Sequence, residues 1–97
     1  MLDIFVCEDN AAQRRTVVNI IQNTVLIEEL DMQLTLDTGD PYMLLEKVKT
    51  SQNTGIYFLD IDLNSNMNGM KLAQQIRLYD PRGFIIFITA HSELSYM

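Results

Sequence analysis

Hydrophobic and polar positions change their period several times along this chain. Residues 2–7 are apolar apart from one aspartate and predict a strand, which ends at the polar residues 8–10. Apolar side chains then recur at helical spacing, which predicts an amphipathic helix from about residue 11 to residue 28. The apolar stripe of this helix consists of Val17, Ile20, Ile21 and Val25. Residues 31–37 alternate between polar and apolar with a period of two, which predicts a strand near a sheet edge with one solvated face.

The second half of the chain repeats this order. Asp40 and Pro41 suit the cap and first position of a helix, with a buried side made of Leu44, Leu45 and Val48. Residues 56–59 form a short apolar strand that ends at Asp60. A third helix follows Gly69, and its apolar face consists of Leu72, Ala73, Ile76 and Tyr79. The strand at residues 84–89 is apolar on both faces, which predicts a central position in a covered sheet.

Strands that alternate with helices predict an α/β fold with a parallel sheet. The specific expectation is a flavodoxin-like, doubly wound sheet with the strand order 2-1-3-4. A central fourth strand needs a neighbour on each side, yet only eight residues follow Thr89. We therefore expect the chain to be part of a longer one. An unpaired edge along this strand, together with bared apolar faces at Phe84, Ile86 and Ile88, predicts self-association.

Composition narrows the function. The 97 residues suffice for one domain, and a net charge of -6 argues against direct binding of nucleic acid or anionic lipid by this segment. The charge fits a domain that holds a cation or meets a basic partner. One cysteine excludes an internal disulfide and fits a reducing compartment. The longest apolar run is far shorter than the roughly 20 residues of a membrane span, so we expect a cytoplasmic location.

Carboxylates follow two of the predicted strands: Glu8 and Asp9 end the first, and Asp60 ends the third. Each acid alone is typical of a solvated loop. Ligands of a doubly wound sheet, however, bind at the carboxyl ends of the strands where the strand order switches, here between the first and third strands. Close carboxylates repel one another, and a hard divalent cation relieves that repulsion. The spacing therefore predicts a Mg²⁺ site formed by these three residues.

The same edge carries the groups needed for phosphoryl transfer. Thr89 ends the fourth predicted strand and offers a hydroxyl beside Asp60. A carboxylate nucleophile next to Mg²⁺ and a hydroxyl suits the acceptance of a phosphoryl group. Asp62 has two interpretations: it supplies only its backbone carbonyl to the metal, or it is a second working carboxylate.

Four other residues invite simpler interpretations. Cys7 is expected to be a small buried apolar residue, and His91 a loop histidine at the start of a fourth helix. Arg14 and Arg15, near the start of the first helix, are expected to be solvated, with contact to an acidic patch on a partner as the alternative.

Several segments carry a resemblance to a known family. Residues 4–10, 57–60 and 87–90, together with Gly69, resemble the receiver domain of bacterial response regulators. Finer features resemble one subgroup, the accessory gene regulator A proteins of Gram-positive bacteria, which act in peptide-pheromone quorum sensing and transcription regulation. The segments that carry this second resemblance are residues 68–72, 76–77, 80–81 and 89–96.

The resemblance implies roles for the candidate residues. Asp60 would accept phosphate from a membrane sensor histidine kinase in a two-component system. Glu8, Asp9 and Asp60 would hold Mg²⁺, helped by the backbone carbonyl of Asp62. Thr89 and Ala90 would contact the phosphoryl group and move on activation.

The resemblance also implies a domain plan. Residues 1–97 would be an incomplete receiver domain, with the last helix-strand-helix segment and its lysine missing. A DNA-binding output domain of the LytTR type would follow, and DNA would be bound only through it. The chain would then be a phosphoacceptor, with at most self-catalysed phosphoryl transfer and autodephosphorylation.

Two other interpretations stay open at this point. Asp60-Ile61-Asp62 with Thr89 also looks like the first two motifs of haloacid-dehalogenase-type phosphatases, in which the two aspartates are nucleophile and general acid/base. That interpretation leaves Glu8 and Asp9 unexplained. The other is a receiver-like interaction module that never takes phosphate.

Overall fold

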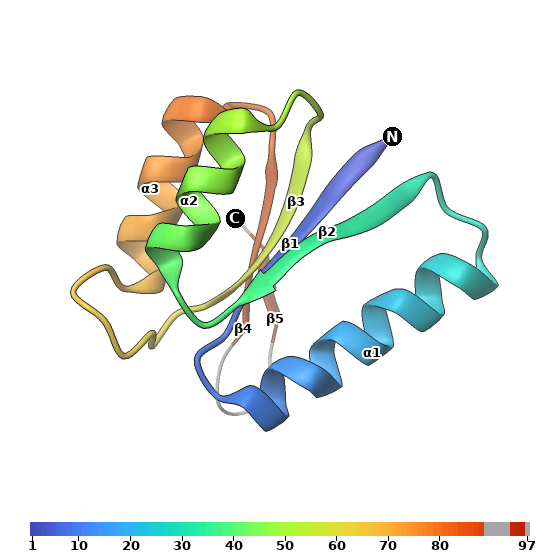
Figure 1. The fold of residues 1–97 in the computed structure, drawn as a ribbon, viewed down its shortest axis with the longest axis horizontal. Helices are drawn as coiled ribbons and strands as arrows, with labels where there is room; N and C mark the ends of the chain where they lie inside the picture. The colour runs from blue at the N-terminus through green and yellow to red at the C-terminus, as the bar shows by residue number, and fades with distance from the viewer. Residues whose placement is uncertain (89–93, 97) are drawn as a thin grey trace.

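A computed structural model describes residues 1–88 and 94–96 of the chain. In this part, helices alternate with strands around one twisted sheet (Figure 1). The elements are β1 (Leu2–Cys7), α1 (Ala11–Ile27), β2 (Met32–Thr38), α2 (Pro41–Thr50), β3 (Gly55–Asp60), α3 (Gly69–Tyr79), β4 (Phe84–Ile88) and β5 (Leu94–Tyr96). The strand order is β2-β1-β3-β4-β5, in which the first four strands are parallel. The predicted flavodoxin-like order 2-1-3-4 is confirmed.

Each helix begins with a polar cap after the carboxyl end of a strand. The side-chain oxygens of Asn10, Asp40 and Asn68 each accept a backbone N–H from the first turn of α1, α2 or α3. Such caps satisfy N–H groups that a helix start leaves without partners. The cap predicted at Asp40 is thereby confirmed. All three helices begin near the carboxyl ends of the strands, where the candidate acids are expected.

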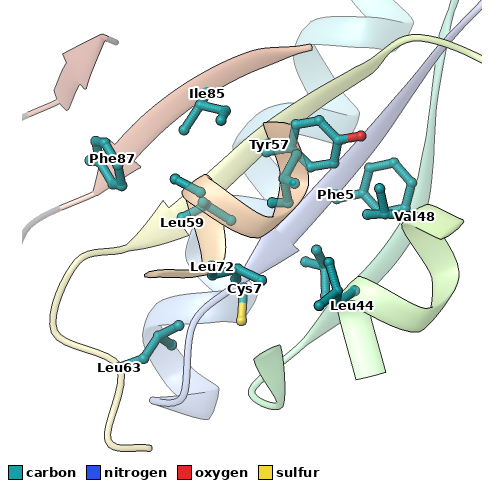
Figure 2. Close-up of a cluster of buried hydrophobic side chains, with 13 residues drawn as sticks. Phe5, Cys7, Leu44, Val48, Tyr57, Leu59, Leu63, Leu72, Ile85 and Phe87 are labelled. Atoms are coloured by element: carbon teal, nitrogen blue, oxygen red, sulfur yellow. The ribbon is translucent and has the colours of Figure 1, made fainter. Parts of the chain in front are cut away.

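The two faces of the sheet are packed to different degrees. Helices α2 and α3 cover one face and α1 covers the other (Figure 1). The α2/α3 face holds the larger core, in which Phe5 stacks on Tyr57 with ring centroids 5.0 Å apart (Figure 2). The α1 face holds a smaller buried cluster, and the groove beside α1 is lined by mostly apolar side chains. The buried residues of this cluster are Ile4, Val6 and Ile21.

Two details of the sequence prediction are wrong. Strand β2 does not keep one apolar face, because its pairing with β1 shifts at Thr35 and turns Leu36 onto the α2/α3 side. Such a bulge inserts one extra residue and reverses the side to which later side chains point. Ile20 does not belong to the buried stripe of α1, since 61% of its surface is exposed.

The expected free edge of the fourth strand is also wrong. Residues 94–96 pair antiparallel with β4, so β4 has a neighbour on both sides. The expectation of a helix starting near residue 91 fails at these residues, which form strand β5. Phe84 is exposed, whereas Ile86 is half-buried and Ile88 is buried. Self-association of the chain stays a prediction. Among the described residues, no helix has the length and apolar character needed to cross a membrane.

Candidate functional site

Three carboxylates converge at the carboxyl ends of β1 and β3. Glu8 and Asp9 directly follow β1, and Asp60 is the last residue of β3. The two strands are neighbours in register, with Cys7 opposite Leu59, so their ends lie level. One carboxylate oxygen from each acid lies within 4.8 Å of the other two. Glu8 and Asp60 are buried, with 2% and 9% of their surface exposed, while Asp9 is open to solvent.

The buried carboxyl of Glu8 is electrostatically costly. Its Oε2 is buried and has no hydrogen-bond partner among the described residues. Burial raises the pKa of Glu8 to about 8, and the neighbouring Asp60 carboxyl adds to the rise. Without a ligand, the burial of this carboxyl with an unpaired oxygen lowers the stability of the folded chain.

Backbone N–H groups fix the other two acids. Burial raises the pKa of Asp9, but hydrogen bonds, above all from the backbone N–H of Asn64, lower it overall. That N–H lies 3.0 Å from Asp9 Oδ2 and joins the loop after β3 to the loop after β1. The N–H of Asp62 donates to Asp60 Oδ1 at 3.0 Å, while Asp62 itself is exposed.

Gly69 allows α3 to start directly against this site. A Cβ atom at this position would collide with the backbone of Asp60 and Ile61. The N–H of Gly69 also donates to the Ile61 carbonyl at 3.3 Å. The close approach requires glycine and holds the turn after Asp60 against the helix.

Comparison with known proteins identifies the family. The profile of the response regulator receiver domain family matches residues 4–97. The chain belongs to the response regulator receiver domain family. It is 54% identical over 96 residues to the accessory gene regulator protein A of Staphylococcus epidermidis strain ATCC 12228. It is 49% identical over 96 residues to the protein of the same name from Staphylococcus aureus strain N315.

Each of these alignments covers 99% of this chain and 40% of the relative, so the chain spans about 40% of the length of the curated relatives it matches. Receiver domains of this family are phosphorylated by sensor histidine kinases and are not enzymes in the usual sense. Family membership therefore favours the regulatory interpretation over the phosphatase.

The donor set of this receiver domain fits a hard divalent cation. The three converging side chains offer only carboxylate oxygens, and the buried Glu8 Oε2 is left without a protein partner in the described residues. Oxygen donors from few side chains, with positions left over for water, are typical of Mg²⁺ sites.

The other predicted residues have mixed outcomes. Thr89, Ala90 and His91 lie outside the described residues. Cys7 is fully buried at the end of β1, and burial, followed by the nearby acids, raises the pKa of its thiol to about 12. Its interpretation as a small buried apolar residue is confirmed.

The expectation that Arg14 is solvated is wrong. Its guanidinium donates to the backbone carbonyl of Glu8 at 2.6 Å and pairs with the carboxylate of Asp37 at 3.3 Å. Nothing in the pattern of α1 distinguishes Arg14 from the exposed Arg15 beside it. The difference comes from the end of β2, which is remote in sequence.

Proposed function

We propose that this receiver domain accepts a phosphoryl group on Asp60 and uses Mg²⁺ held by Glu8, Asp9 and Asp60. The observation that supports it most strongly is the convergence of these three acids, one of them buried with an unpartnered oxygen, at the end of the sheet. The backbone carbonyl of Asp62 is proposed as a further metal ligand. When bound, Mg²⁺ neutralises the charge on the phosphoryl oxygens.

Asp60 has the position that a nucleophile needs. It closes a strand paired on both sides, so its backbone is fixed, and the Asp62 N–H holds Oδ1. In the transfer, a carboxylate oxygen of Asp60 forms a bond to phosphorus. The bond from phosphorus to the histidine nitrogen of the kinase breaks, and that nitrogen keeps the electron pair. Fixed orientation accelerates such a step because the reacting atoms need no further ordering.

Asp62 lacks this fixed position. Its side chain is exposed and lies in the turn after β3. We therefore expect its carboxylate to be dispensable for labelling.

The test is phosphotransfer from a small acyl phosphate to the natural, full-length protein in the presence of Mg²⁺. Asp60→Asn removes the nucleophile and is expected to abolish labelling. Asp62→Asn, the matched control, is expected to retain it. If Asp60→Asn still labels and Asp62→Asn does not, the assignment is wrong.

The wider role follows from the relatives and is proposed with it. We propose a membrane sensor histidine kinase as the phosphoryl donor and Thr89 and Ala90 as the residues that contact the phosphoryl group. Self-catalysed transfer and autodephosphorylation would be the limit of its catalysis. A LytTR-type output domain after the receiver domain would bind DNA and regulate transcription in peptide quorum sensing. For this role we propose a cytoplasmic location.

A further inference from the structure

Arg14 contacts the backbone of the loop that carries Glu8 and Asp9. It lies in the first turn of α1, where its backbone N–H donates to the Asn10 carbonyl at 2.8 Å. Its Nη1 donates to the Glu8 carbonyl at 2.6 Å, and its Nε lies 3.3 Å from Asp37 Oδ1 in β2. One side chain thus joins the start of α1, the loop after β1 and the end of β2.

The backbone of Glu8 is thereby fixed on both sides. Its N–H donates to the Thr38 carbonyl at 3.0 Å, and its carbonyl accepts from Arg14. The Glu8 side chain is buried, and its Oε2 has no partner among the described residues that could orient it. The direction of that oxygen therefore depends on the backbone from which the side chain extends.

The loop after β2 closes tightly over the same point. A Cβ atom on Gly39 would lie 3.2 Å from Arg14 Nη1 and 3.2 Å from Asp9 Cα. These distances are tighter than ordinary contact, so a larger residue at position 39 would press on the guanidinium and on the backbone of Asp9. Movement of Arg14 would be transmitted to the loop that carries both acids through its hydrogen bond to the Glu8 carbonyl.

We propose that Arg14 is a positioning residue for the cation site, and that it acts by the geometry of its guanidinium and not by its charge. The proposal rests on the proposed function. Asp37 already balances the charge of Arg14, and a pair with side chains 24% and 41% exposed contributes little stability of its own. The planar guanidinium, in contrast, presents two donors in fixed directions, and a lysine ammonium cannot reproduce this arrangement.

The experiment compares four variants of the natural, full-length protein: Arg14→Lys, Arg14→Gln, Arg15→Lys and Arg15→Gln. Arg15 is the matched control because it is adjacent, exposed, and without a hydrogen bond or ion pair in the part of the chain that the structure covers. Titration calorimetry with Mg²⁺ alone gives the dissociation constant. Amide hydrogen exchange of Glu8 and Asn64, measured without Mg²⁺, reports on the two loops that hold the acids.

Both Arg14 variants are expected to weaken Mg²⁺ binding about tenfold and to accelerate exchange at Glu8 and Asn64. Both Arg15 variants are expected to stay within twofold of the unaltered protein. Asp37→Asn, which leaves Arg14 in place without its anchor, is expected to shift binding in the same direction by a smaller factor. Its effect is expected to vanish in the Arg14→Gln background.

Three results would overturn the proposal. If Arg14→Lys binds Mg²⁺ as tightly as the unaltered protein does, the charge of residue 14 is sufficient and its geometry is not needed. Unchanged exchange together with weakened binding would exclude positioning through the loop. Absence of Mg²⁺ binding by the unaltered protein would overturn the proposed function and this inference with it, whereas the first two results leave the proposed function intact.

Discussion

The two ends of the sheet carry acids in opposite surroundings. At the amino ends of the strands, buried Asp3 accepts hydrogen bonds from Gln33 Nε2 at 2.9 Å and Ser51 Oγ at 2.7 Å. Asp80 Oδ2 accepts from the Gly55 N–H at 2.8 Å and the Tyr57 hydroxyl at 2.7 Å. At the carboxyl ends, Glu8, Asp9 and Asp60 crowd together, and one buried oxygen has no partner in the described residues.

This difference separates acids that stabilise the fold from the acids of the proposed cation site. Burial raises the pKa of Asp3, but donors led by Gln33 and Ser51 lower it overall, so the fold favours its charged form. Burial and then Asp60 raise the pKa of Glu8 to about 8, so the fold disfavours its charge. By linkage, the stability that Asp3 adds to the folded state is lost as pH falls. The folded state is also less stable as pH rises through about 8, because the buried Glu8 carboxyl then loses its proton. The fold thus provides donors for Asp3 and Asp80, whereas Glu8 Oε2 has none among the described residues, as the proposed cation site would require.

The largest effect is expected at the amino end, from Asp80→Ala. This change leaves the Gly55 N–H and the buried Tyr57 hydroxyl without their acceptor. Each such loss costs about 1–3 kcal/mol, so we expect the free energy of unfolding to fall by about 3 kcal/mol in urea melts. Tyr57→Phe removes only one donor and is expected to cost less. Exposed Glu28→Ala is the control, with a change below about 0.5 kcal/mol. Additive losses in the Tyr57→Phe, Asp80→Ala double variant would contradict the interaction.

A smaller effect with a distinct pH signature is expected from Asp3→Asn. The folded-state pKa of Asp3 is lowered, so its contribution is present above the unfolded pKa of roughly 3.9 and is lost as pH falls through the folded value. We expect the variant to lose about 1–2 kcal/mol at pH 7 and nothing extra once the pH has fallen below the folded-state pKa of Asp3. Thermal melts across this range measure it. A loss that is equally large at pH 7 and pH 2 would mean that packing, and not charge, is the cause.

Some of this comparison could be predicted from the sequence. The convergence of Glu8, Asp9 and Asp60 follows from strand order, because parallel neighbouring strands bring their carboxyl ends together. The helix caps and the buried stripes of α2 and α3 follow from local residue types and period. These features depend on short segments or on topology alone.

The rest depends on contacts between segments remote in sequence. No local pattern marks Asp3 and Asp80 as acceptors that stabilise the fold. Their donors, Ser51 and the Gly55 N–H, lie 48 and 25 positions away in the sequence. Arg14 differs from Arg15 only through Asp37 and the Glu8 carbonyl. The bulge at Thr35 and the antiparallel strand β5 depend on pairing with β1 and β4, which the local pattern of residue types does not show.

Mg²⁺-dependent melting of this receiver domain tests whether a cation site is formed by the acids at the carboxyl end and not by those at the amino end. A ligand at a hundredfold excess over its dissociation constant stabilises the native state by about 2.7 kcal/mol. We expect Mg²⁺ to raise the melting temperature of the unaltered domain and of Asp3→Asn by roughly 10–20 °C, and to leave that of Asp9→Ala nearly unchanged. Equal shifts in all three proteins would show that Mg²⁺ does not bind through Asp9.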